Sequence, residues 1–220
     1  MKKKIAVVLC GSGYLDGSEI RESVAVLWAL SKHPVEVSIF APNENQFHVM
    51  DCLHKKPVAG EVRNQMVEAA RIARGQISPL SELNMDRFNG LILPGGFGAA
   101  KNLCTFAFDG VKGKVHPVLE RSIEIAHHSK KPIGAVCIAP VIVALALRNA
   151  GLKLTLGGAG EAATAVEALG HEHVVCAVNQ AVVDSKNRVV STPAYMIEDA
   201  YLFEIFEGIE SLVREVVALA

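Results

Sequence analysis

The sequence lacks the features that mark nucleic-acid-binding and membrane-spanning proteins. Its formal net charge is -1, so there is no excess of cations to neutralise a phosphate backbone. Its longest apolar stretch without a central charge, residues 133–147, contains Pro140 and is shorter than the ~20 residues that cross a bilayer. We therefore expect neither nucleic acid nor membrane as a partner.

Disulfide and metal signatures are also missing. The five cysteines are an odd number, are widely spaced and form no C-x-x-C pair. The apolar run at residues 5–10, after three lysines, is too short for a signal peptide and ends in a glycine turn. Free thiols and no export signal predict a cytoplasmic protein.

Half of the residues are hydrophobic and 20% are charged, which suffices for one sizeable core in a chain of 220 residues. Short apolar runs alternate with helical patterns, as expected for strands and crossover helices of a parallel sheet. We predict a single α/β domain over residues 1–220, with an insertion around residues 43–80 that begins in a polar, irregular stretch.

The pattern predicts strands at residues 4–9, 35–40, 90–93, 132–136 and 152–156, and a hairpin of residues 181–183 and 188–190. It predicts helices at residues 18–31, 61–74, 118–128, 140–148 and 161–169, and a long one after Pro193. In the first helix, Ser18 is the expected N-cap, and Ile20, Val24, Leu27 and Trp28 form the expected apolar face.

Cys137 is the candidate nucleophile. It follows a buried strand directly and precedes a helix whose Pro140 suits the first turn. Such a turn lifts a side chain towards the carboxyl edge of the sheet, where α/β proteins bind ligands, and the helix dipole favours a thiolate. The alternative, a small buried hydrophobic residue at a strand-helix junction, is equally open from position alone.

A glycine-rich turn, residues 95–98, ends another expected strand. Glycine permits positive φ and close approach of the backbone to a ligand. Beside Cys137, the N–H groups of Gly96 and Ile138 would form an oxyanion hole, with Gly95 and Phe97 lining the pocket. A tight loop without a ligand remains the alternative.

The glycines at residues 11–17 do not form a dinucleotide fingerprint, because Asp16 occupies the third glycine position. Glu19, in the first turn of the following helix, is the candidate proton partner of the thiol, although a dipole-stabilising glutamate is the more ordinary role there. Tyr195 follows a strand and is a further pocket candidate.

The eight histidines do not make a convincing metal site, and His171 and His173 are expected at the surface. Neither a metal nor another cofactor is therefore expected. The remaining cysteines, Cys10, Cys52, Cys104 and Cys176, lack an activating context and are expected to be structural.

Together these motifs resemble the class I glutamine amidotransferase-like superfamily, its PfpI/ThiJ branch and, within it, the ElbB family. The resemblance spans nearly the whole chain and is carried by residues 13–20, 68–75, 93–103, 137–140 and 192–196. It implies a flavodoxin-like three-layer sandwich with a mostly parallel central sheet, and a homodimer. It also implies Cys137 as nucleophile, Glu19 as its acidic neighbour and the turn at Gly95 and Gly96 as the oxyanion side.

Three departures from the superfamily pattern stand out, and the first two argue against glutaminase and protease activity. The sequence has no His-x-Glu, so the base used by the superfamily's glutaminases is missing. The residue after Cys137 is Ile138, where PfpI-type proteases have histidine. Alanines flank the nucleophile at positions 135 and 139, where the usual elbow has glycines, so we expect a tighter pocket.

The resemblance implies a weak glyoxalase, a lyase that converts glyoxal or methylglyoxal to a hydroxy acid without a cofactor, and a link to isoprenoid biosynthesis. We expect a small aldehyde substrate. The alternative is a non-catalytic protein of the same fold that senses oxidants through Cys137 or supports another enzyme.

Overall fold

The computed structural model describes residues 2–220. Its central sheet has seven strands in the order β10-β11-β7-β6-β1-β2-β5, parallel except for the antiparallel pair β10–β11. The strands are β1 (Lys3–Val8), β2 (Val35–Ala41), β5 (Ser78–Pro79), β6 (Gly90–Leu93), β7 (Ile133–Val136), β10 (Val182–Asp184) and β11 (Val189–Thr192). Two minor pairs are β3 (Met50–Asp51) with β4 (Lys56–Pro57) and β8 (Lys153–Leu154) with β9 (Glu172–His173).

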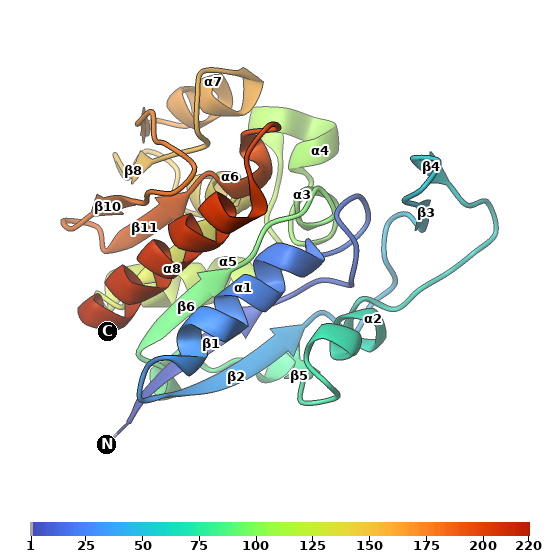
Figure 1. The fold of residues 1–220 in the computed structure, drawn as a ribbon, viewed down its shortest axis with the longest axis horizontal. Coiled ribbons are helices and arrows are strands. Elements are labelled where there is room, and N and C mark those ends of the chain that lie inside the picture. Colours follow the sequence, from blue (N-terminus) through green and yellow to red (C-terminus); the bar gives the residue numbers. More distant parts are fainter. Residues whose placement is uncertain (1) are drawn as a thin grey trace.

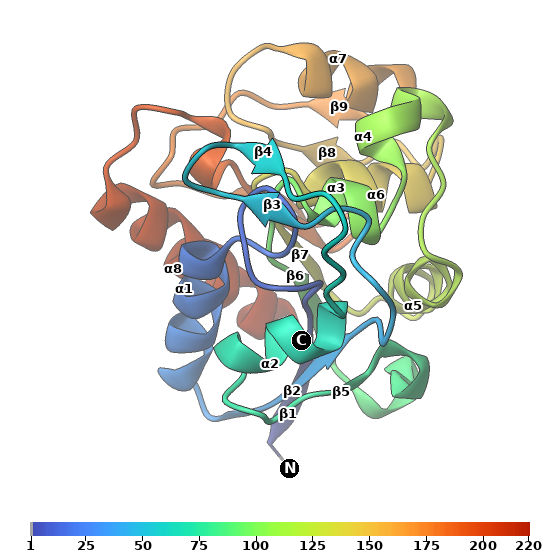
Figure 2. The ribbon, with the colours of Figure 1, turned by 90° about the vertical axis from the view of Figure 1, so that its right-hand side faces the viewer.

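Helices cover both faces of this sheet (Figures 1 and 2). The longer α1 and α8 pack side by side on one face, with α5 and α6 on the other. The helices are α1 (Ile20–Ser31), α2 (Gln65–Ile72), α3 (Ala99–Asn102), α4 (Phe106–Asp109), α5 (Pro117–His128), α6 (Ala139–Ala146), α7 (Glu161–Ala168) and α8 (Leu202–Leu219). The predicted three-layer α/β sandwich is confirmed.

The core lies at the middle strands. All residues of β6 and β7 are buried, and Ile5, Leu91, Leu93 and Ile133 are fully buried. Burial of each such side chain contributes about 1.5–3 kcal/mol, which explains why these strands are nearly continuous apolar runs. The chain passes from β1 to β2 on one side and returns to β6 on the other, so the switch in strand order falls between β1 and β6. Ligands of open α/β sheets bind at the carboxyl ends of strands at such a point.

The first helix begins later than predicted and turns a different face to the core. Ser18 is not its N-cap, because the Ser18 hydroxyl accepts a hydrogen bond from the Cys10 N–H at 2.9 Å, and Glu19 caps the helix instead. Three of the four residues of the predicted apolar face are also misplaced: Ile20, Val24 and Trp28 are all at least 40% exposed, whereas Leu27 is partly buried and packs against the core.

The region of the expected insertion divides into two parts. The β3–β4 hairpin projects from the body (Figure 1), whereas β5 pairs with β2 as the edge strand of the central sheet. Helix α2 is shorter than predicted because the Asn64 side chain caps it by accepting from the Val67 N–H at 3.0 Å. The insertion itself stays a prediction.

Candidate active site

Cys137 lies on a sharp turn between β7 and α6. Its φ is 61°, a left-handed conformation that is uncommon for a residue with a Cβ. A hydrogen bond to β11 fixes this turn, since the Cys137 N–H donates to the Thr192 carbonyl at 2.9 Å. The side chain is only 7% exposed but lines a cavity at the carboxyl edge of the sheet. This is the geometry of a nucleophile elbow.

The turn after β6 requires glycine where it passes Cys137. A Cβ on Gly95 would lie 2.5 Å from the Cys137 Cβ and 2.7 Å from Oε2 of Glu22. Gly96 has φ +106°, and a Cβ there would lie 2.5 Å from the Glu19 backbone nitrogen. Both glycines therefore allow the loop after β1, the β6 turn and the cysteine to meet.

Two backbone amides lie beside the sulfur. The N–H groups of Gly96 and Ile138 interact with the Cys137 side chain, and both lower its pKa. Donors placed in this way stabilise negative charge on the sulfur or on an oxygen bonded next to it. The two residues expected from the sequence to supply an oxyanion hole are thus brought together at Cys137.

The acid beside the thiol is Glu22. Its side chain is fully buried, and Oε2 accepts the Gly95 N–H at 3.0 Å, while the nearby Tyr195 N–H also lowers the pKa of this carboxyl group. The Cys137 thiol lies against this carboxyl, whose Oε1 has no hydrogen-bond partner among residues 2–220. Burial, and secondly the negative charge of Glu19, raise the pKa of Glu22 to about 8.

Glu19, expected as the acidic neighbour, occupies a different place. Its Oε2 accepts the Glu22 N–H at 2.6 Å, so it caps α1, and it lines the cavity. Burial raises the pKa of Glu19. The contact with the thiol falls to Glu22, which is one helical turn further along and faces the sheet.

A signal for Glu22 was present in the sequence. The buried positions of α1 include Glu22, Val26 and Ala29, which recur at helical spacing, so a glutamate lies in the apolar stripe. An ionisable residue is rarely fully buried without a partner. Because the exposed side of α1 also carries apolar residues, that side was predicted to face the core, and Glu22 was overlooked.

The thiol is not acidified by its position. Burial raises the pKa of Cys137 well above its ordinary value, and the charge of Glu22 raises it further. The expectation that the helix dipole makes a resting thiolate is therefore wrong, because desolvation outweighs it. Glu22 and Cys137 form a coupled pair that holds its protons at neutral pH and shares one negative charge when the first is lost.

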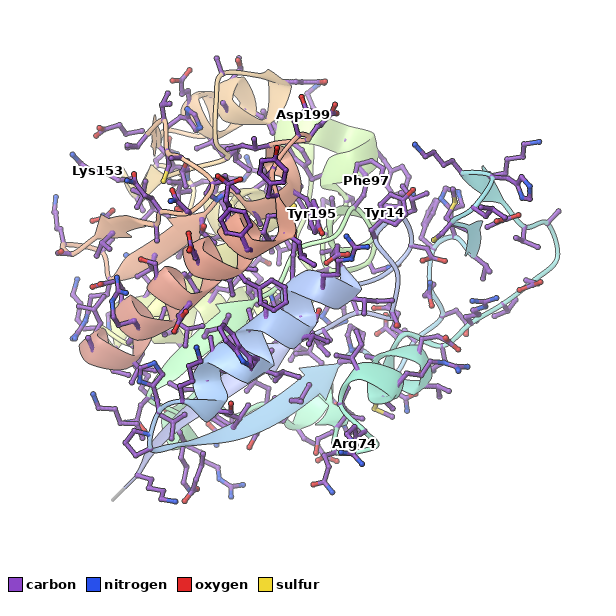
Figure 3. The ribbon with its side chains drawn as sticks, in the orientation of Figure 1. Tyr14, Arg74, Phe97, Lys153, Tyr195 and Asp199 are labelled. Atoms are coloured by element: carbon purple, nitrogen blue, oxygen red, sulfur yellow. The ribbon has the colours of Figure 1, made fainter. Side chains whose placement is uncertain are left out.

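The cavity in front of Cys137 has a volume of about 1140 Å³. Its walls include Phe97 and Tyr195, as expected, whereas Gly95 lies behind the cysteine and donates to Glu22. Figure 3 places Tyr14, Phe97 and Tyr195 at the same end of the sheet. Arg21 also lines the cavity and donates to the Tyr195 hydroxyl at 2.9 Å.

Other titratable groups lie outside this site. Within residues 2–220 no group of three or more histidines, cysteines or carboxylates is placed to hold a metal ion. Cys10 and Cys104 are buried, and burial raises the pKa of each to about 12. His171, expected at the surface, is 7% exposed; its Nδ1 accepts the Leu152 N–H and its Nε2 donates to the Ala144 carbonyl.

The parallel sheet, cysteine elbow and glycine turn are those of the class I glutamine amidotransferase-like fold. No family model matches the chain. It is 47% identical to human glutamine amidotransferase-like class 1 domain-containing protein 3, mitochondrial, over 98% of this chain and 83% of the human protein. It is 45% identical to the rat ES1 protein homolog, mitochondrial, over 99% of this chain and 84% of the rat protein.

The chain therefore belongs to the ES1 family of glutamine amidotransferase-like class 1 proteins. Among solved structures, an Ehrlichia chaffeensis isoprenoid biosynthesis protein with an amidotransferase-like domain is 40% identical, with a TM-score of 0.90 over 99% of both chains. Drosophila melanogaster DJ-1beta is 17% identical with a TM-score of 0.57, over 99% of this chain and 97% of that one, which shows a shared fold. The resemblance in the sequence is confirmed at the level of the family.

The expected cytoplasmic location is not confirmed, because the human and rat relatives are named as mitochondrial. Among residues 2–220, no helix combines the length and apolar character needed to span a bilayer.

Proposed function

We propose that this chain is a cofactor-independent glyoxalase-type lyase that converts a 2-oxoaldehyde to a 2-hydroxy acid through Cys137. The observation that carries the proposal is the thiol of Cys137 set between a buried acid, Glu22, and the N–H groups of Gly96 and Ile138. A nucleophile, a proton carrier and an oxyanion hole are the groups that this reaction needs.

The first step joins the sulfur to the aldehyde carbon. Glu22 in its carboxylate form takes the thiol proton as the sulfur adds, and the new oxyanion accepts hydrogen bonds from Gly96 and Ile138. Glu22 then gives its proton to this oxygen, which leaves a neutral hemithioacetal and a carboxylate again. The buried site carries one negative charge throughout, which moves from Glu22 to the oxygen and back.

The second step moves a hydrogen between the two carbons of the substrate. Glu22 removes the proton from the former aldehyde carbon, and the electron pair moves through an enediol to the neighbouring carbonyl carbon, which takes the proton back. The aldehyde carbon is oxidised to a thioester while the ketone carbon is reduced to an alcohol. Water then cleaves the thioester, which releases the hydroxy acid and restores the thiol.

Glu19 supports this cycle through Glu22. Its negative charge lies close enough to raise the pKa of Glu22, which keeps a proton available near neutral pH. It is thus a positioning and tuning residue, in place of the direct proton shuttle that the sequence suggested.

The experiment measures methylglyoxal consumption and lactate formation by the wild type and by Cys137→Ser, Glu22→Gln and Glu19→Gln. We expect Cys137→Ser and Glu22→Gln each to lose at least about 100-fold in kcat, within the range for lost acid-base catalysis. Glu19→Gln shifts the pH optimum downwards instead. Equal rates for the wild type and Cys137→Ser would exclude the mechanism.

A second candidate function is oxidant sensing at the same sulfur. The donors at Gly96, Ile138 and Glu22 that suit an oxyanion also suit the oxygens of a cysteine sulfinate. Mild peroxide followed by peptide mass spectrometry would then oxidise Cys137 ahead of the more exposed Cys52. Preferential oxidation of Cys52 would count against this candidate.

The name of the Ehrlichia relative associates that protein with isoprenoid biosynthesis. A link of this chain to isoprenoid biosynthesis belongs to the proposal on that basis alone. Deletion of the coding sequence followed by measurement of isoprenoid products would test it, and unchanged levels would remove the link.

A further inference from the structure

The cavity in front of Cys137 is much larger than the substrates of the simplest glyoxalase reaction. A water molecule occupies roughly 30 Å³ in the liquid, so the five heavy atoms of methylglyoxal fill on the order of 150 Å³. The cavity measures about 1140 Å³, which is above the usual range of about 300–1,000 Å³ for sites that enclose drug-sized ligands. A three-carbon aldehyde would leave most of it to water.

The walls of this space carry several aromatic residues beside charged ones such as Lys55 and Glu161. The aromatic lining residues are Tyr14, Phe97, Phe106, Phe108 and Tyr195. They come from four separate segments: the loop after β1, the glycine turn after β6, helix α4, and the turn after β11. Aromatic rings contributed from several segments make a surface suited to a flat apolar group.

Two of these rings are only partly covered by the protein. Phe97 and Phe108 are each 47% exposed although both line the cavity. The Phe97 N–H donates to the Tyr14 carbonyl at 2.7 Å, which fixes these two segments beside each other (Figure 3). The Phe108 ring packs on Phe47 with 4.2 Å between ring centroids. The exposed apolar area is therefore held in place before any ligand binds.

We infer that the cavity selects compounds in which the reacting two-carbon unit bears an aromatic or comparably large apolar group. This inference rests on the proposed function and names its substrate class, of which phenylglyoxal is the model. Cys137 adds to the aldehyde carbon while the ring lies against Phe97 and Phe108. The hydrogen shift and hydrolysis described above then give mandelate, with one water consumed and no external oxidant or reductant.

The kinetic test compares phenylglyoxal with methylglyoxal. Product formation, mandelate or lactate, is measured by chromatography, so that loss of aldehyde to arginine or lysine side chains is not counted. We expect kcat/KM for phenylglyoxal to exceed that for methylglyoxal by about tenfold or more. Phe97→Leu lowers this ratio by about threefold to tenfold, the range for a lost aromatic pair.

The matched control is Phe203→Leu. Phe203 is also an exposed phenylalanine, at 62%, but it belongs to α8 and does not line the cavity. We expect it to leave both the ratio and the activity unchanged. A fall in the ratio for Phe203→Leu as large as that for Phe97→Leu would contradict the assignment of Phe97.

A binding test separates the substrate class from the chemistry. Calorimetry measures the affinity of the Cys137→Ser variant for mandelate and for lactate. The double variant Cys137→Ser, Phe97→Leu is the control. Tighter binding of mandelate that depends on Phe97 supports the inference even if neither aldehyde is turned over, a result that would remove the proposed function. Cys137-dependent turnover with equal kcat/KM for both aldehydes would overturn the inference and leave the proposed function intact. Absence of both preference and turnover would overturn both.

Discussion

Glu22 is buried against Cys137, and neither group titrates independently of the other. The Glu22 carboxyl accepts the Gly95 N–H and lies near that of Tyr195, while the N–H groups of Gly96 and Ile138 lie beside the sulfur. Removing the first proton from the pair leaves one negative charge surrounded by these four amides. Burial resists that charge, and the amides stabilise it.

Alkylation of Cys137 should rise as the pH passes about 8, the pKa of Glu22. Below that value both groups keep their protons, and above it the pair shares a charge that gives the sulfur thiolate character. In Glu22→Gln the rise is no longer tied to pH 8 and follows the pKa of the thiol alone, since neither the charge of a carboxylate nor a shared proton is left. Iodoacetamide labelling from pH 5 to 10, resolved for each cysteine by mass spectrometry, measures it.

Cys52 is the internal control for this experiment. It is partly exposed, and the causes of its raised pKa do not include Glu22. Its labelling profile should therefore be the same in the wild type and in Glu22→Gln. Complete labelling of wild-type Cys137 already at pH 6 would mean a resting thiolate and would contradict the coupled pair.

Glu22 should make the protein less stable as the pH rises. Its pKa is about 8 in the folded chain against 4.5 ordinarily, so between these values the folded state binds more protons than the unfolded state. The free energy of unfolding then falls with increasing pH through this window and is lowest above pH 8. Glu22→Gln removes this pH dependence, and its free energy of unfolding at pH 8 exceeds that of the wild type by on the order of a few kcal/mol. Urea unfolding at pH 5 and pH 8 measures both effects.

Gln at position 22 keeps an acceptor for the Gly95 N–H, so the variant isolates the ionisation. Glu36→Gln is the control, since Glu36 lies at the surface, where its ion pair with Lys4 at 3.6 Å contributes little. If the free energy of unfolding depends on pH equally in the wild type and in Glu22→Gln, then ionising Glu22 in the folded chain carries no free-energy cost.

Gly95→Ala should disrupt the site where the turn after β6 passes Cys137. A Cβ there would also lie 2.7 Å from the Val136 carbonyl oxygen, so it meets backbone as well as side chains. Such overpacking costs typically about 1–3 kcal/mol. Gly158→Ala is the matched control, because nothing lies within 4 Å of a Cβ at that position. Thermal unfolding and Cys137 labelling should change in the first variant and remain unchanged in the second.

The sequence predicts the middle of this molecule better than its edges. Strand β6 has the predicted bounds, and β1, β2 and β7 differ from prediction by a residue or so at their ends, because buried parallel strands read as apolar runs. The two-residue strands β5 and β9 have no such pattern and were not predicted. Their pairing depends on tertiary contacts that a short window of sequence does not contain.

The candidate site shows the same division. Cys137 and the glycine turn are readable because strand ends and glycines mark backbone positions. The choice between Glu19 and Glu22 depends on which side of α1 faces the sheet, and the exposed Ile20, Val24 and Trp28 imitate a buried face. A pattern of apolar residues alone does not say which of two faces is covered.

At Cys137, where the backbone is left-handed, a glycine variant should be at least as stable as an alanine variant, the reverse of the usual order. Elsewhere glycine is less favourable than alanine because it loses more freedom on folding. At φ 61° a Cβ costs roughly 1–2 kcal/mol, which glycine avoids and which offsets that loss. Cys137→Gly should therefore be at least as stable as Cys137→Ala. Ala144→Gly, in the buried interior of α6, should lose between about 1 and 2 kcal/mol from helix propensity and the lost methyl group. Urea midpoints of the three variants and the wild type measure these differences. The elbow stores no strain if Cys137→Gly is less stable than Cys137→Ala by the same amount as Ala144→Gly is less stable than the wild type.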